Sequence, residues 1–390
     1  MVKNNSKLFL LILSGMLSAF GPFVTDMYLP SLPSMANDFN ASPSMVQLGL
    51  TTSMCGLAAG QIFFGPLSDK YGRRLPLLIA MWLFIFSTIL CLISPTIEWF
   101  VAFRFIQGIA GAGGIVISRS VATDKFSGKE LAKMLAIIGA INGIAPVAAP
   151  VIGGLLTESV GWKGIFGVLL ALGCVLLIIC LRFCETLEET RRLSGGVAAT
   201  FRTFGIIVHH RRFLYYVLQM GFAQGILFGY IASSPFIIQQ HYGFSALAFS
   251  ICFSINAVAI GLGAALSTKF NSLEKSTLIG SIGMFVLAIA ELIALSAGCS
   301  FFVYEILLFL LLFMMGTTFT SSTTLAMDCE RRKAGAASAL LGAVCFMFGG
   351  IVSPLVGLGD TLLTTGVIFV LCGVCSLWFA WRGMSRCLHG

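Results

Sequence analysis

Two charged side chains stand inside long apolar stretches of the sequence, Asp26 in the first stretch and Arg104 in the fourth. A charge at the depth of a bilayer costs about 2.5 to 3.5 kcal/mol on insertion scales, so each residue needs a compensating role. The first stretch should run outward and the fourth inward, which places Asp26 and Arg104 at similar depth. We expect them to share a polar cluster in which Asp26 takes up and releases a proton as Arg104 withdraws or approaches. The alternative is a static pair that orders two helix ends.

Two carboxyl groups also lie in apolar stretches of the second half of the chain, Glu291 and Glu305. We expect Glu305 to lie at the membrane interface, while Glu291 is an open candidate for binding a proton or a cationic substrate. Aromatic and amide side chains in the apolar stretches suit a cavity for large amphipathic molecules. The candidates for lining this cavity are Tyr28, Gln107, Tyr230, Phe236, Asn256 and Glu291.

The residue types that enzymes use are not arranged here for catalysis. We find no nucleotide-binding loop, no metal-ligand spacing and no catalytic triad spacing, and most of the twelve cysteines lie in apolar stretches. We therefore expect no enzymatic activity, no metal and no other cofactor. Without an ATP-binding motif, an ion gradient must supply any work that the chain performs.

Composition indicates which elements hold these residues. Of 390 residues, 57% are hydrophobic and only 10% are charged, which leaves too little polar surface for a water-soluble globule of this size. Twelve apolar runs have the roughly 20 residues that a helix needs to cross a bilayer core of about 30 Å. We predict an all-α membrane protein whose twelve transmembrane helices span residues 8–30, 43–64, 75–94, 97–118, 132–156, 164–183, 213–238, 245–268, 276–297, 301–325, 334–356 and 361–382.

Basic residues set the predicted orientation. Of the 24 Lys and Arg residues, all but Arg104 and Lys163 fall on the side that both termini share. By the positive-inside rule both termini are cytoplasmic in a bacterial inner membrane, and the net charge of +8 needs no nucleic-acid partner. The longest charged connection then divides the chain into six-helix halves, residues 1–183 and 213–390, joined by a cytoplasmic linker over 184–212. Such pseudo-symmetric halves surround a midplane cavity that opens alternately to either side of the membrane.

The connection from Gly65 to Arg74 reads Gly-Pro-Leu-Ser-Asp-Lys-Tyr-Gly-Arg-Arg and carries charges of both signs. A topological anchor would need only the basic residues. The connection resembles the signature loop of the major facilitator superfamily, Gly-x-x-x-Asp-x-x-Gly-Arg-Arg/Lys, at every defining position. The resemblance implies a cytoplasmic gating loop in which an acidic residue at the end of the fourth span is the partner of Arg73. Its residues are Gly65, Asp69, Gly72, Arg73, Arg74 and Asp124.

Three further segments resemble the bicyclomycin and chloramphenicol resistance branch of the drug:proton antiporters in that superfamily. They are residues 25–33 (Thr-Asp-Met-Tyr-Leu-Pro-Ser-Leu-Pro), 104–108 (Arg-Phe-Ile-Gln-Gly) and 145–154 (Ala-Pro-Val-Ala-Ala-Pro-Val-Ile-Gly-Gly). The last is similar to the antiporter motif, with Ala at its first two small positions. The resemblance makes this motif a seal against proton leak, formed by Pro146, Pro150, Gly153 and Gly154.

The resemblance implies a secondary active transporter that exports small amphipathic compounds in exchange for protons by alternating access, as a single chain in the lipid bilayer. The alternative is an exporter of an endogenous metabolite, such as a siderophore or an amino-acid derivative, because the same scaffold serves both.

Overall fold

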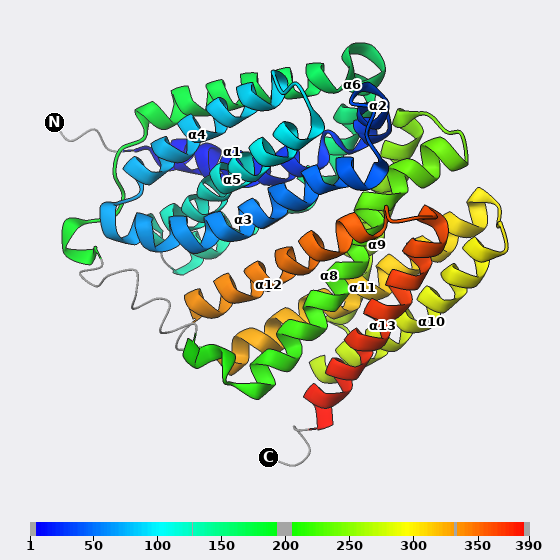
Figure 1. The fold of residues 1–390 in the computed structure, drawn as a ribbon. Coiled ribbons are helices and arrows are strands. Elements are labelled where there is room, and N and C mark those ends of the chain that lie inside the picture. Colours follow the sequence, from blue (N-terminus) through cyan, green and yellow to red (C-terminus); the bar gives the residue numbers. More distant parts are fainter. Residues whose placement is uncertain (1–4, 127, 193–204, 331–333, 386–390) are drawn as a thin grey trace.

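The computed structural model describes residues 5–126, 128–192, 205–330 and 334–385, and every regular element in these ranges is a helix. Figure 1 shows them in two groups that follow one another along the chain. The first group holds α1 (Lys7–Asp26), η1 (Leu29–Ser31), α2 (Leu32–Asp38), α3 (Pro43–Tyr71), α4 (Arg74–Leu92), α5 (Ile97–Lys125) and α6 (Gly128–Arg182). After η2 (Glu189–Arg191), the second group holds α8 (Arg211–Phe236), η3 (Ile237–His241), α9 (Ala246–Ser267), α10 (Leu273–Ser296), α11 (Phe301–Cys329), α12 (Ala334–Leu355) and α13 (Thr361–Ser385).

Ten helices in the described residues are long and apolar enough to cross a membrane, so the protein is a multi-pass membrane protein. One of them, α6, holds two predicted spans because the chain doubles back at Gly161, whose φ of 65° residues with side chains rarely adopt. The described apolar part of α12 is shorter, Ala339–Leu355. These two helices account for the difference from the twelve predicted spans.

Several predicted span ends are wrong by more than one helical turn. The first span was expected to reach residue 30, but α1 ends at Asp26 and the chain turns through η1 into α2, where Pro30 and Pro33 restrict the backbone. The second span was expected to end at residue 64, but α3 continues to Tyr71. The predicted gating connection is therefore helical over most of its length, and the turn itself consists of Gly72 and Arg73.

The packing of the first group recurs in the second. In the first group α1 packs on α5 and α6, α3 on α5, and α4 on α5 and α6. In the second group α8 packs on α11 and α12, α9 on α11, and α10 on α11 and α13. The groups meet through α3 against α12 and α6 against α9. The fold is thus a pair of pseudo-symmetric halves, while the predicted boundaries at 183 and 213 stay a prediction, since residues 193–204 lie outside the described residues.

Glycines allow the closest helix crossing in each half. A Cβ on Gly108 of α5 would overlap the carbonyl oxygen of Ser53 in α3. In the second half, a Cβ on Gly263 of α9 would overlap the carbonyl oxygen of Phe313 in α11. Small residues let helix backbones approach in this way. The equivalent helices of the two halves therefore cross by the same device.

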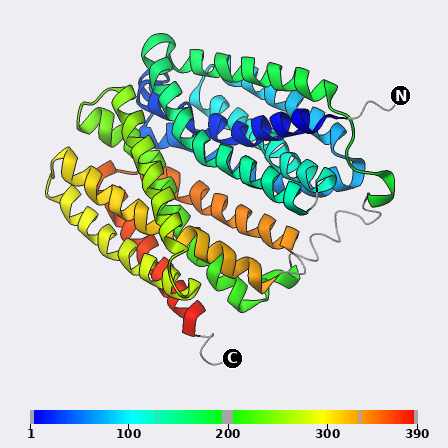
Figure 2. The same ribbon diagram turned by 180° about the vertical axis from the view of Figure 1, so that it is seen from behind.

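Hydrogen bonds between the halves gather at one end of the molecule, which we call the junction end. They join Ser44 to Pro354 (3.1 Å), Gln47 to Ala232 (3.0 Å), Gln239 to Pro30 (2.9 Å), Leu247 to Glu158 (3.3 Å) and Ser254 to Val147 (3.0 Å). The opposite end, here the terminal end, carries both ends of the described chain and the turn at Gly72. Figures 1 and 2 both show the two groups of ribbons lying closer at the junction end than at the terminal end.

The Gly108 crossing makes a first prediction. Gly108→Ala should lower the melting temperature of the purified protein, because overpacking costs about 1 to 3 kcal/mol when backbone atoms cannot move aside. Gly111→Ala on the same helix is the matched control, since its Cβ would meet only Leu57 at 3.7 Å. Thermal unfolding in detergent, followed by size-exclusion chromatography, compares them. Equal melting temperatures would contradict the close crossing.

Candidate functional site

Arg104 lies in the middle of the N-terminal half with no exposed surface. One end of its guanidinium donates to the side-chain oxygen of Gln107, and the other donates to the carbonyl oxygen of Val24 at 3.2 Å. The group also lies 4.4 Å from the centre of the Tyr28 ring and 5.7 Å from that of Phe166. Cation–π contacts gain strength when they are desolvated. A carbonyl dipole, an amide oxygen and two aromatic rings thus replace the water that this charge has lost.

Asp26 ends α1 beside this cluster and is 8% exposed. Val24 and Tyr28, which lie two residues before and two residues after Asp26, contact Arg104, but no nitrogen of Arg104 lies within 4.0 Å of an Asp26 oxygen in the described structure. The predicted cluster is therefore assembled around Arg104 without a direct ion pair.

Gln107 links the cluster to α4. Its amide nitrogen donates to the hydroxyl of Thr88 at 2.7 Å, while its oxygen accepts from Arg104. An amide that donates to one neighbour and accepts from another has its orientation set by both. Three helices of the N-terminal half, α1, α4 and α5, therefore meet at the Arg104 guanidinium.

The two glycines of the predicted antiporter motif face in different directions. A Cβ on Gly153 would overlap the carbonyl oxygen of Met27, the residue that follows Asp26. A Cβ on Gly154 would overlap the hydroxyl of Ser250 and lie 3.0 Å from the carbonyl oxygen of Ala246, both in α9 of the other half. The motif thus joins the end of the Asp26 helix to the junction between the halves.

The prolines of the same motif lie one and two turns before these glycines. Pro150 is buried and Pro146 is half-buried in α6. A proline inside a helix supplies no backbone N–H to the preceding turn. Near this interruption, the Ser254 hydroxyl of α9 donates to the Val147 carbonyl at 3.0 Å, so a side chain from the other half bonds the α6 backbone.

Arg73 organises the turn at the terminal end. Its guanidinium binds both carboxylate oxygens of Asp124 at 2.8 and 3.3 Å, and also bonds Ser68 at 2.8 Å and Asp69 at 2.5 Å. A planar guanidinium suits such a bidentate pair. The ends of α3, α4 and α5 are therefore held together by one side chain.

Glu185, which follows α6, was missing from the predicted site. Its two carboxylate oxygens accept from the backbone N–H groups of Arg73 at 2.8 Å and Arg74 at 3.1 Å, where α4 begins, and one oxygen also accepts from the N–H groups of Thr186 and Leu187. Burial alone would raise the pKa of this carboxyl, but the four donors hold it below its ordinary value. A carboxylate at a helix N-terminus is also favoured by the helix dipole.

The position of Glu185 gives a steric reason for one of the two glycines in the predicted loop but not for the other. Gly72 has a φ of 88°, and a Cβ there would come within 2.8 Å of the carboxyl carbon of Glu185. A Cβ on Gly65 would meet nothing within 4 Å. The sequence signal for Glu185 is its place as the first acidic residue after the sixth span, three residues beyond Arg182.

The C-terminal half holds a second polar group, on α8, α9 and α11. The Asn256 amide nitrogen donates to a carboxylate oxygen of Glu305 at 2.8 Å and to the hydroxyl of Tyr230 at 3.3 Å. Glu305 lies in the second turn of α11 and accepts from this amide, while its expected place at the membrane interface stays a prediction. Glu291 in α10 is fully buried. Tyr230 and Asn256 thus belong to a polar group separate from the one that holds Tyr28 and Gln107, while Glu291 makes no hydrogen bond in the described structure.

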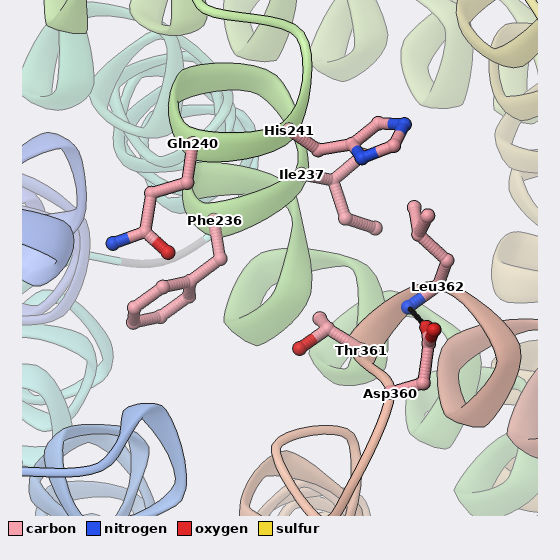
Figure 3. Close-up of a pocket in the computed structure, with 7 residues that line it drawn as sticks. All are labelled: Phe236, Ile237, Gln240, His241, Asp360, Thr361 and Leu362. Atoms are coloured by element: carbon pink, nitrogen blue, oxygen red, sulfur yellow. Dashed lines mark hydrogen bonds between the residues drawn. The ribbon is translucent and has the colours of Figure 1, made fainter.

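Phe236, the remaining predicted cavity residue, lines a pocket of about 310 Å³ near the junction end (Figure 3). Gln240 lies beside Phe236 in this view, and the Asp360 carboxylate across the pocket accepts from the backbone N–H of Leu362 at 2.8 Å. No group of three or more His, Cys, Asp or Glu side chains in the described part of the chain could hold a metal ion. The other residues that line the pocket are Ile237, His241 and Thr361.

Comparisons with known proteins agree with this architecture. The sequence matches the Major Facilitator Superfamily over residues 11–354. It is 40% identical to the uncharacterized MFS-type transporter YdgK of Bacillus subtilis, with 96% of this chain and 95% of that protein covered. It is 30% identical to a bicyclomycin resistance protein homolog of Haemophilus influenzae (89% of each chain) and 27% identical to the multidrug resistance protein MdtL of Escherichia coli (94% and 93%).

The fold is also found in solved structures. A bacterial homolog of the human lysosomal transporter Spinster, in an inward-facing and unoccupied conformation, superimposes with a TM-score of 0.79 at 18% identity, over 98% of each chain. A D-xylose-proton symporter superimposes with a TM-score of 0.74 at 16% identity, over 96% of this chain and 98% of that one. With its sequence match, its repeated six-helix packing and its charged turn between α3 and α4, the chain belongs to the major facilitator superfamily of transporters, where it groups with the bicyclomycin and multidrug resistance proteins.

Proposed function

We propose that the protein exports small amphipathic compounds from the bacterial cytoplasm in exchange for protons, by alternating access across the inner membrane. The observation that carries this proposal is the fully buried Arg104 beside Asp26. A guanidinium and a carboxyl at membrane depth are each costly, so both need a compensating role. The uptake and release of a proton at this place is such a role.

The coupling would work through competition for Arg104. When Asp26 is protonated, Arg104 keeps its bonds to Gln107 and the Val24 carbonyl, as in the present structure. When Asp26 loses its proton, its negative charge attracts the guanidinium and weakens those bonds. Since the Val24 carbonyl belongs to α1 and Gln107 to α5, the change of partner alters how these two helices pack. A ligand or proton shifts a two-state equilibrium only through such a difference in contacts.

The distribution of contacts between the halves supports an open terminal end. The junction end is closed by hydrogen bonds and by the contact of Gly154 with α9. At the terminal end, Arg73 bonds residues of the N-terminal half and Glu185, which directly follows α6. By the placement of basic residues the terminal end faces the cytoplasm. In this conformation a substrate would enter from the cytoplasm.

The substrate class rests on the aromatic surroundings and on the relatives. Tyr28 and Phe166 at the Arg104 cluster, and Tyr230 stacked on Phe253, offer flat apolar surfaces with few polar groups. Such surroundings suit large amphipathic molecules. The names of two relatives, a bicyclomycin resistance protein homolog and a multidrug resistance protein, favour antibiotics within this class.

Asp26→Asn should abolish substrate-dependent proton movement, because an amide cannot exchange a proton at this place. Purified protein in liposomes with an acidic interior would be challenged with bicyclomycin, chloramphenicol, a fluoroquinolone and a siderophore while a pH-sensitive dye reports proton efflux. Glu188→Gln, an exposed position after α6, is the matched control and should behave as the wild type. Undiminished coupling in Asp26→Asn would overturn the role of Asp26, and a response to the siderophore alone would favour export of a metabolite.

Arg104→Lys should also impair transport although it keeps the positive charge. A lysine ammonium cannot bond Gln107 and the Val24 carbonyl with a planar fork, nor stack on Tyr28 in the same way. Disturbing a buried charge and its partners costs about 2 to 5 kcal/mol, so we expect transport to fall at least tenfold. Transport rates in the same liposomes test this expectation. Wild-type rates in Arg104→Lys would show that only the charge matters.

Glu185→Gln should weaken the start of α4 and lower the melting temperature, as the loss of a helix N-cap costs about 0.5 to 2 kcal/mol. The folded pKa of Glu185 lies below its ordinary value, so its contribution is present at neutral pH and is lost as the pH falls through that folded pKa. The difference from the wild type should therefore shrink in acid. Melting curves at several pH values, with Glu188→Gln as control, test both points. A difference that grew in acid would contradict the assignment.

A further inference from the structure

The C-terminal half contains buried acceptors without donors. Neither carboxylate oxygen of Glu291 has a hydrogen-bond partner in the described structure, and the residue has no exposed surface. One oxygen of Glu305 accepts from Asn256, but the other is buried and lacks a donor. The side-chain oxygen of Asn256 is also buried without a donor. Buried polar atoms in native proteins are almost always paired, so these oxygens need an explanation.

This polar group has more hydrogen-bond acceptors than donors. Both N–H groups of the Asn256 amide are engaged, one by Glu305 and one by Tyr230. A carboxylate only accepts, whereas a carboxylic acid carries an O–H that donates. Adding a proton therefore removes a charge and supplies a missing donor in one step. A structural salt bridge would have needed a basic side chain, which none of the described residues provides within 4.0 Å of either carboxyl.

The neighbouring elements bring no positive charge to Glu291. α10, which carries Glu291, packs on α13 and on α11, which carries Glu305 (Figure 1). The two carboxyl groups lie within electrostatic reach of one another across the contact between α10 and α11. The only basic residue of α13 is Arg382 in its last turn, at the other end of the span. The remaining charged or titratable side chains on α8, η3, α9, α10, α11 and α13 and in the connections between them are Arg211, Arg212, Tyr215, Tyr216, Tyr230, His241, Tyr242, Cys252, Lys269, Glu274, Lys275, Cys299, Tyr304, Asp328, Cys329, Asp360, Cys372 and Cys375. The basic side chains among them lie at the terminal end of their helices, except His241, whose ring centre lies 4.7 Å from that of Tyr242. None of them forms an ion pair with Glu291 or Glu305 in the described residues.

We propose that Glu291 and Glu305 form a second proton-carrying site, in the C-terminal half and separate from Asp26. This second site rests on the proposed function and adds a second proton to the proposed exchange of substrate for protons. A hydronium ion from water on one side transfers its proton to a carboxylate oxygen, where an O–H bond forms, and the proton returns to water on the other side when that bond breaks. Two interacting carboxylates titrate as a unit, so the proton belongs to the pair rather than to either residue alone.

The site is connected to the junction between the halves. Tyr230, which bonds Asn256, lies two residues before Ala232, whose carbonyl accepts from Gln47 of α3. On α9, Asn256 lies two residues after Ser254, which bonds the α6 backbone. Loss of the proton would charge the pair and draw the Asn256 amide more strongly to Glu305. The helices that move in response are those that close the junction end.

Difference infrared spectroscopy of the full-length protein in lipid tests this site without any substrate. When the pH is raised, the spectrum of the wild type should lose a band that comes from protonated carboxyl groups. This pH-dependent band should be absent from Glu291→Gln and still present in Asp26→Asn. A pH-indicator dye should count fewer protons released by Glu291→Gln than by the wild type. Glu188→Gln is the matched exposed control for both readouts. Glu305→Gln carries the same test if Glu291→Gln does not fold.

Two outcomes would overturn the proposal. An unchanged band and proton count in both Glu291→Gln and Glu305→Gln would show that neither residue carries a proton. Loss of the band on adding Na⁺ or tetraphenylphosphonium at constant pH would instead show that the pair binds a cation. Failure of the proposed function is distinguishable, because it would abolish substrate-dependent proton movement in liposomes while leaving this infrared signal intact.

Discussion

The burial of one guanidinium is the constraint on which the N-terminal half depends. Arg104 has no water to solvate it, so α1 must present the Val24 carbonyl, α5 must present Gln107, and the chain after α1 must place the Tyr28 ring over the charge. Each of these partners comes from a different local feature: a helix end, a helix face and a turn. The end of α1 at Asp26 is therefore not an arbitrary helix terminus, since it is where backbone and ring reach the same cation.

Close packing at two glycines connects the Arg104 cluster to the junction between the halves. Gly153 packs against the Met27 carbonyl, and Gly154 packs against α9 of the other half. The end of α1 is therefore connected to the other half through two adjacent residues. At the far end of the same half, Arg73, Asp124 and Glu185 tie together the ends of α3, α4, α5 and α6. These four helix ends are thus bonded to one another within the N-terminal half.

Hydropathy and charge predicted much of this protein for clear physical reasons. Lipid requires long apolar helices, so the spans could be counted from composition, and the run of both charge signs around Asp69 and Arg73 marked the turn. Helix ends were harder to predict, because α3 continues through polar residues to Tyr71 that hydropathy places outside the membrane. The roles of Glu185 and Glu305 could not be predicted, since each depends on a partner more than 40 residues away, Arg73 in one case and Asn256 in the other.

The most direct test of the account is whether the two ends of the molecule open in alternation as protons bind and leave. Spin labels on Lys70 and Lys269 would report the distance between the halves at the terminal end, and labels on Ser42 and Asp360 would report it at the junction end. Double electron–electron resonance in lipid, on a cysteine-free background, would follow both distances as the pH changes. The account predicts that one distance shortens while the other lengthens, and that Asp26→Asn holds the protein in the low-pH arrangement. Distances that stayed constant with pH, or that changed in the same direction, would contradict it.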